Sequence, residues 1–211
     1  MIVVGLTGSI GMGKSTAAEM LREMGIPIHD ADATVHKLMG PGGGAVAAIA
    51  ALCPASLKTG DDGQDFIDRK ILGKHIFADA TLKADVEGVL YPMVQASEET
   101  FIAEKTKEGQ RMVVLDVPLL FETGWDARVD KTICVSAPPE VQRTRVLARP
   151  GMTEERFEAV LKAQLPDADK RTRSDFVVDT GVGFDDTRRQ LKEIVATLLP
   201  APKSKPPGLR P

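Results

Sequence analysis

The sequence predicts an α/β fold in which a parallel sheet is flanked by helices, with an inserted helical lobe and a helical lid. Short apolar runs typical of buried parallel strands occur at residues 2–7, 26–29, 112–115, 131–135 and 176–178. A glycine-rich loop follows the first run and leads into a helical segment, which is the start of a βαβ unit. Residues 33–107 carry helical patterns and no strand signal of comparable strength, so we expect a helical insertion there.

The domain organisation follows from these patterns. We expect a nucleotide-binding core at residues 1–32, 108–141 and 174–199, a helical acceptor lobe at 33–107 and a lid at 142–173. Within the lobe, residues 65–69 and 87–104 are the clearer helical pieces. Five prolines among the last twelve residues predict a flexible, extended tail at 200–211.

Composition excludes several classes of protein. The net charge of −3, from 27 basic and 30 acidic residues, gives no electrostatic reason to expect nucleic acid or an anionic membrane as partner. The longest apolar run, residues 45–53, is about half the length that a bilayer-spanning helix needs. Cys53 and Cys134 lie far apart and show no metal-type spacing. We therefore expect a cytoplasmic enzyme with reduced thiols and no signal peptide.

The glycine-rich loop carries the most specific motif. Residues 8–15 match G-x-x-x-x-G-K-[ST] in full, with Gly8, Ser9, Ile10, Gly11, Met12, Gly13, Lys14 and Ser15 in order. Such a P-loop presents backbone N–H groups to phosphate at a helix N-terminus. Lys14 would reach the β- and γ-phosphates, Ser15 would offer its hydroxyl to Mg²⁺, and Thr16 would lie near the α-phosphate. The preceding strand and following helix disfavour a chance glycine-rich turn, so the motif predicts an ATP site with Mg²⁺.

Carboxylates at two predicted strand ends are candidate catalytic groups. Asp30 and Asp32 follow the second strand, at the edge where α/β sheets place ligands. A carboxylate there can accept a proton from an attacking hydroxyl or hold Mg²⁺ through water. The alternative is a helix cap, which for Asp30 is equally favoured. Asp116 ends a third strand and resembles a Walker B carboxylate that orients Mg²⁺.

Arginines gather in the predicted lid. Arg145 and Arg149 are four residues apart and share one helix face. Phosphoryl transfer needs cations over the γ-phosphate, because negative charge spreads over three oxygens in the transition state. The alternative is a solvated helix paired with glutamates, which we expect for Arg143, Arg156 and Arg173.

Several motifs in the same order resemble those of the dephospho-CoA kinases. The resemblance runs from residue 3 to about residue 183. It includes GLTGSIGMGKS at 5–15, DAD at 30–32, PGG at 41–43, IDRKIL at 67–72, PLLFE at 118–122, Gln142 with Arg145 and Arg149, Ala163-Gln164 with Lys170, and SDFVVD at 174–179.

The resemblance implies roles for individual residues. Asp32 would be the general base for the ribose 3′-hydroxyl of dephospho-CoA, and Arg145 and Arg149 would act on the transferred phosphate. Thr180, where the family has Asn, would lie near the ATP adenine. Tyr91 stands where the family has His. Contacts to the acceptor are implied for Thr7, Asp32, Tyr91, Pro118, Leu119, Leu120, Phe121 and Glu122.

The function expected is ATP-dependent phosphorylation of dephospho-CoA, giving CoA and ADP. A kinase of another small acceptor, such as a nucleotide or shikimate, is the nearest alternative. A regulatory protein that binds ATP without transferring phosphate is the alternative from another class. Both a monomer and a small homo-oligomer remain open.

Overall fold

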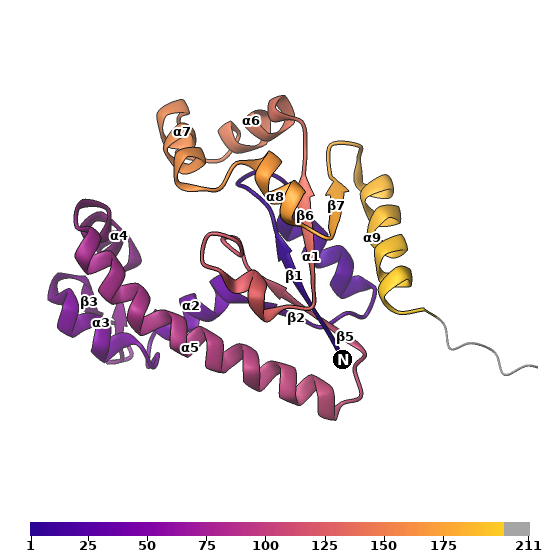
Figure 1. Cartoon of the computed structure of the whole chain (residues 1–211). Coiled ribbons are helices and arrows are strands. Elements are labelled where there is room, and N and C mark those ends of the chain that lie inside the picture. The colour runs from indigo at the N-terminus through magenta and orange to yellow at the C-terminus, as the bar shows by residue number, and fades with distance from the viewer. Residues whose placement is uncertain (201–211) are drawn as a thin grey trace, which may run out of the picture. The chain divides into compact units, whose positions relative to one another are not determined.

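The computed structural model describes residues 1–200 and divides into two compact units (Figure 1). The first unit contains residues 1–28 and the chain from residue 109 onward, and the second contains residues 29–108. From residue 201 on, the predicted tail lies outside the described residues.

The five-stranded sheet has the strand order β2-β5-β1-β6-β7, and all of its strands except β2 lie wholly in the first unit. The strands are β1 (Ile2–Thr7), β2 (Ile28–Asp30), β5 (Met112–Asp116), β6 (Lys131–Ser136) and β7 (Phe176–Asp179). Pairing of β1 with β5, of β1 with β6 and of β6 with β7 is parallel. The predicted parallel α/β fold is therefore confirmed.

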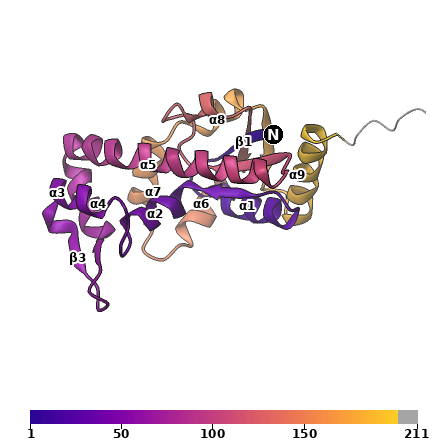
Figure 2. The ribbon, with the colours of Figure 1, turned by 90° about the horizontal axis from the view of Figure 1, so that it is seen from below.

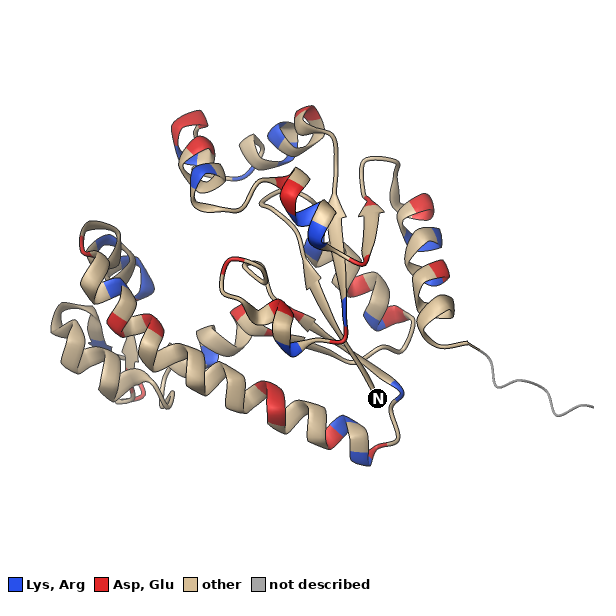
Figure 3. Cartoon of the chain, in the orientation of Figure 1, with Lys and Arg blue, Asp and Glu red and all other residues tan. Residues whose placement is uncertain are grey.

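Helices cover the two faces of this sheet. Helices α1 (Lys14–Glu23) and α9 (Phe184–Leu198) place Leu21 and Leu191 in one apolar core with Val4 and Leu6 of β1. Because side chains alternate along a strand, Cys134 of β6 points to the other face, where it neighbours α8 (Asp167–Arg173). Acidic and basic residues alternate along α9, the last helix of the unit (Figure 3).

Two further helices, α6 (Pro139–Leu147) and α7 (Glu154–Ala163), follow β6 in the first unit. Thr153 caps α7, since its side chain accepts a hydrogen bond from the backbone N–H of Arg156. Three arginines were expected to pair with glutamates, and Arg143 does so with Glu154. Arg156 instead donates to the Gly151 carbonyl, and Arg173 pairs with Asp126.

The second unit is mainly helical. Its helices are α2 (Ala31–Met39), α3 (Val46–Leu52), η1 (Pro54–Ser56), α4 (Arg69–Ala78) and α5 (Ala80–Lys107). An apolar cluster joins Ile49 of α3, Leu72 of α4, and Val86 and Leu90 of α5. These positions explain why α3 and α4 lie beside the N-terminal half of α5 (Figure 2). No helix within residues 1–200 is both long and apolar enough to cross a membrane.

One prediction for the second unit is wrong. Residues 65–69 were expected to be helical, but β4 (Asp65–Ile67) pairs antiparallel with β3 (Leu57–Thr59). The helix starts only after Asp68, whose carboxylate caps α4 by accepting from the N–H groups of Lys70 and Ile71. Strands of three residues are too short to show a period of two, so no strand signal was visible.

Both cysteines are free and buried. Burial raises the pKa of the Cys134 thiol to about 11, so this thiol is protonated at neutral pH. The expectation of two unpaired structural thiols agrees with this arrangement.

Candidate active site

The phosphate loop lies between β1 and α1, as the motif predicts. Gly11 and Gly13 have φ values of 76° and 85°, a region that side chains disfavour. Gly13 is also the N-cap of α1, so the backbone turns into the helix without a side chain in the loop. The positive end of the α1 dipole and the N–H groups of its first turn therefore meet at the loop.

Lys14 is paired with Asp116. Lys14 Nζ lies 2.5 Å from Asp116 Oδ1, and the two side chains are 16% and 5% exposed. The parallel register Leu6↔Asp116 explains the pairing, because it places the end of β5 beside the end of β1, where the loop begins. The structure thus brings together the P-loop lysine and the predicted Walker B carboxylate.

Arg145 of α6 binds Thr180, which follows β7. Its guanidinium donates to the Thr180 carbonyl at 2.7 Å and to the Thr180 hydroxyl at 3.0 Å. The same hydroxyl donates to the Met12 carbonyl of the phosphate loop at 2.9 Å. Thr180 is thus buried between Arg145 and the phosphate loop. Arg149, the second lid arginine, is exposed.

The segment at residues 118–122 contacts the end of β1 and α8. The Pro118 carbonyl accepts hydrogen bonds from the hydroxyl of Thr7 and from Lys170 Nζ. Glu122 accepts from Lys170 at 2.7 Å and from the N–H of Leu165 at 2.8 Å, and Lys170 is fully buried. Burial alone would raise the pKa of Glu122, but these bonds hold it below its usual value.

The apolar residues of the same segment differ in exposure. Leu120 is fully buried and Phe121 nearly so, with the Arg173 guanidinium 4.4 Å from the Phe121 ring centroid. Leu119 is 37% exposed. The sequence suggested acceptor contacts for all of these residues, and the structure gives Leu120, Phe121 and Glu122 packing or ion-pair partners within the first unit.

Asp32 and Tyr91 belong to the second unit. The Asp30 carboxylate accepts a hydrogen bond from the Ala33 N–H at 2.9 Å, so Asp30 caps α2. A helix cap was one of the two roles that the sequence left open for this residue. Asp32 is exposed in the first turn of that helix. Tyr91 is 38% exposed on α5, and burial together with nearby Glu87 raises the pKa of its hydroxyl.

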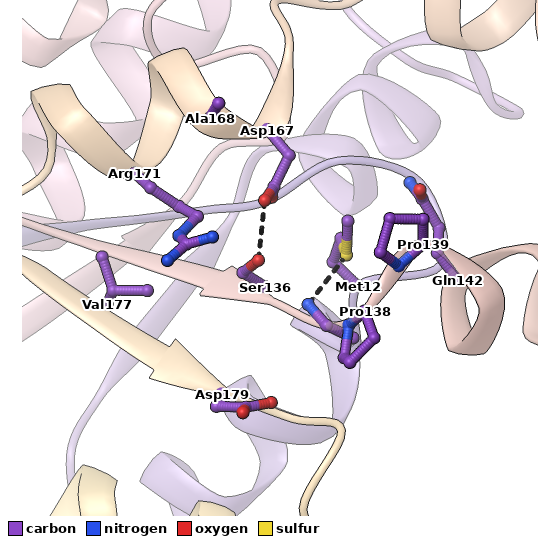
Figure 4. A pocket seen from close by; sticks show the side chains of 11 residues that line it. Met12, Ser136, Pro138, Pro139, Gln142, Asp167, Ala168, Arg171, Val177 and Asp179 are labelled. Atoms are coloured by element: carbon purple, nitrogen blue, oxygen red, sulfur yellow. Dashed lines mark hydrogen bonds between the residues drawn. The ribbon is translucent and has the colours of Figure 1, made fainter.

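A cavity of about 430 Å³ lies next to the phosphate loop (Figure 4). Arg171 of α8 lines it from one side and Asp179 from another, and Ser136 donates to Asp167 at 2.7 Å. Its lining residues are Met12, Ser136, Ala137, Pro138, Pro139, Gln142, Asp167, Ala168, Arg171, Val177 and Asp179. The sequence did not predict this cavity, because its walls come from segments far apart in the chain.

Sequence reasoning also missed the contacts of two lid glutamines and of Lys170. Gln142 and Gln164 both bind the backbone of Ile10 in the phosphate loop. The family pattern contains these residues, but a pattern does not show which group a neutral amide will bind. Lys170 lies in a polar run, where nothing signals that it is fully buried.

A family model described as dephospho-CoA kinase matches residues 2–186. The chain belongs to the dephospho-CoA kinase family. It is 48% identical over 198 residues to a dephospho-CoA kinase of Rhizobium meliloti, covering 94% of this chain and 98% of that protein. It is 47% identical over 202 residues to one of Brucella melitensis, covering 96% and 98%.

Solved structures agree with membership of the dephospho-CoA kinase family. A structure described as TT1252 from Thermus thermophilus has a TM-score of 0.79 and 34% identity, covering 93% of this chain and 97% of that one. A dephospho-CoA kinase from Campylobacter jejuni has a TM-score of 0.68 and 26% identity, covering 93% and 96%.

Proposed function

We propose that this chain transfers the γ-phosphoryl group of ATP to the ribose 3′-hydroxyl of dephospho-CoA, giving CoA and ADP. The observation that carries this proposal is an intact P-loop whose Lys14 is paired with Asp116, in a member of the dephospho-CoA kinase family. Neither alternative, a different small acceptor or a regulatory ATP-binding protein, is favoured by an observation.

ATP binding would use the loop backbone from residues 8–16. The N–H groups at the start of α1 would hold the phosphate chain, and the Lys14 ammonium would exchange its Asp116 partner for phosphate oxygens. Lys14 is 16% exposed, so its ion pair lies where a phosphate group can replace it.

The residues near Lys14 fit Mg²⁺. Ser15 offers a hydroxyl and Asp116 a carboxylate, and both are oxygen ligands of the type that Mg²⁺ prefers. Within residues 1–200 no cluster of three or more His, Cys, Asp or Glu side chains could hold a metal. When bound, Mg²⁺ would neutralise negative charge on the phosphates.

Asp32 would act as the general base. Asp30 uses its carboxylate to cap α2, whereas Asp32 is exposed in the first turn of the same helix. A carboxylate in this position would accept the proton of the 3′-hydroxyl as that oxygen attacks the γ-phosphorus.

Arg145 and Arg149 would stabilise the transferred phosphoryl group. Arg145 is already held beside the phosphate loop through Thr180, which bonds both the arginine and the Met12 carbonyl. A guanidinium fixed in this way is preorganised to bind negative charge. Thr180 would then act near ATP through Arg145 and the loop.

Acceptor binding would involve Tyr91 and Leu119. Tyr91 is 38% exposed and Leu119 37% exposed, and Asp32 is exposed as well. Tyr91 can donate a hydrogen bond through its hydroxyl but, unlike His, cannot carry a positive charge.

Product analysis tests the proposal. The enzyme would be incubated with ATP, Mg²⁺ and dephospho-CoA, and the product examined by mass spectrometry and ³¹P NMR. We expect a product with one added phosphate, whose new resonance is that of a 3′-phosphomonoester. Formation of ADP with no phosphorylated acceptor would contradict it.

A further inference from the structure

Ile10 in the phosphate loop binds two glutamines through both of its backbone polar groups. Its N–H donates to Gln164 Oε1 at 3.0 Å, and its carbonyl accepts from Gln142 Nε2 at 2.8 Å. One glutamine thus acts as an acceptor and the other as a donor.

The two glutamines come from opposite ends of the arginine-bearing segment. Gln142 lies on α6 and is 6% exposed, and it is labelled beside Pro139 in Figure 4. Gln164 follows α7 directly as its C-cap residue. Arg145 and Arg149 lie between them, so both ends of this segment are attached to one residue of the phosphate loop.

Packing around the next residue leaves no room for the loop to shift toward α6. A Cβ atom on Gly11 would lie 2.5 Å from Val146 Cγ2 and 3.1 Å from the Gln142 carbonyl oxygen. One residue further, the Met12 carbonyl accepts from Thr180, which also binds Arg145. Residues 10–12 are therefore held by the lid segment and by Thr180. Lys14 and the residues after it belong to α1.

We propose that Gln142 and Gln164 are positioning residues that fix the Ile10 backbone to α6 and to the C-terminal end of α7. They would keep the phosphate loop and the lid arginines in one relative arrangement during phosphoryl transfer. A displacement of about 1 Å can cost on the order of 100-fold in rate, so two hydrogen bonds at this place suffice to matter. The proposal rests on the proposed kinase activity and concerns the same site.

The opposite roles of the two amides allow a matched test. Gln164→Glu keeps an acceptor for the Ile10 N–H, whereas Gln142→Glu has no donor for the Ile10 carbonyl and places a carboxylate against it. Both variants add the same negative charge near the same residue. Methionine variants at the same two positions test the hydrogen bonds without an added charge.

We expect Gln164→Glu to keep kcat within about threefold of wild type, and Gln142→Glu to lose about tenfold or more. Gln142→Met and Gln164→Met, which remove each hydrogen bond, should both lose about tenfold. The ATP dissociation constant, measured by calorimetry, should change less than about threefold, because Lys14 and the N-terminus of α1 are untouched. Equal kcat values for the two glutamate variants, or wild-type kcat in both methionine variants, would overturn the positioning role.

Amide hydrogen exchange gives a readout that does not depend on activity. The Ile10 N–H should exchange slowly in wild type and in Gln164→Glu, and faster in Gln164→Met. Fast exchange of Ile10 in the wild-type protein would also overturn the proposal. Failure of wild type to phosphorylate dephospho-CoA would instead contradict the proposed function, so the two failures are distinguishable.

Discussion

Lys14 Nζ lies 2.5 Å from Asp116 Oδ1, and this ion pair joins the phosphate loop to the end of the neighbouring strand β5. The aspartate is 5% exposed, so the lysine compensates a carboxylate that is nearly removed from water. In the proposed function, the lysine would exchange this partner for the phosphate oxygens of ATP.

Lys14→Met should abolish most turnover. The variant keeps the length of the side chain but removes the charge that would reach the β- and γ-phosphates, so we expect kcat/KM for ATP to fall about 100-fold or more. Steady-state kinetics with dephospho-CoA would measure this. Lys192→Met is the control, because Lys192 is an exposed lysine on α9, away from the phosphate loop in sequence, and the variant should behave as wild type. Unchanged kcat/KM in Lys14→Met would exclude the lysine from catalysis.

Asp32→Asn should lower kcat by about 100-fold or more, because an amide cannot accept the proton of the 3′-hydroxyl. ATP affinity should be nearly unchanged. Asp30→Asn is the matched control, since Asn is as good an N-cap as Asp and should preserve α2. Near-wild-type turnover in Asp32→Asn would remove Asp32 from the mechanism.

Lys170→Met should destabilise the fold by roughly 3 kcal/mol, since it leaves Glu122 without its ion-pair partner. Urea unfolding followed by circular dichroism measures this change. The double variant Lys170→Met/Glu122→Gln removes the unpaired charge and should recover part of the loss. A loss below about 1 kcal/mol for Lys170→Met would show that the buried pair contributes little.

Glu122 should make stability depend on pH in the acidic range. Its pKa in the folded protein lies below the ordinary value of 4.5, since the bonds to Lys170 and Leu165 outweigh the effect of burial. Glu122 therefore stabilises the fold fully above about pH 4.5, and this stabilisation is lost as pH falls through the lower folded-state pKa. Unfolding free energies from pH 7 to pH 3 should fall less steeply for Glu122→Gln than for wild type. Parallel curves would contradict the assignment.

Local motifs made the core of the site predictable. The P-loop spacing and the apolar run ending at Asp116 specify a strand, a turn and a helix, and the parallel register then brings Asp116 to Lys14. The pairing of Arg143 with a glutamate was also predictable, because Glu154 is close to it in sequence.

Long-range contacts were not predictable. Lys170 and Glu122 are separated by nearly fifty residues, and nothing in either local sequence indicates that Lys170 is fully buried. The same holds for Ile10 and Gln164, whose pairing requires the complete crossover from β6 to β7. The hairpin of β3 and β4 was missed for a different reason, since its strands are too short for periodicity to identify.

Acceptor-dependent ADP release tests the proposed function most directly. Purified protein with ATP and Mg²⁺ would be assayed with dephospho-CoA, AMP, shikimate or no acceptor, while ATP binding is measured separately. We predict rapid ADP release with dephospho-CoA and only background release in the other three reactions. ATP binding without ADP release in any of the four reactions, or release that favours AMP or shikimate, would contradict the proposed function.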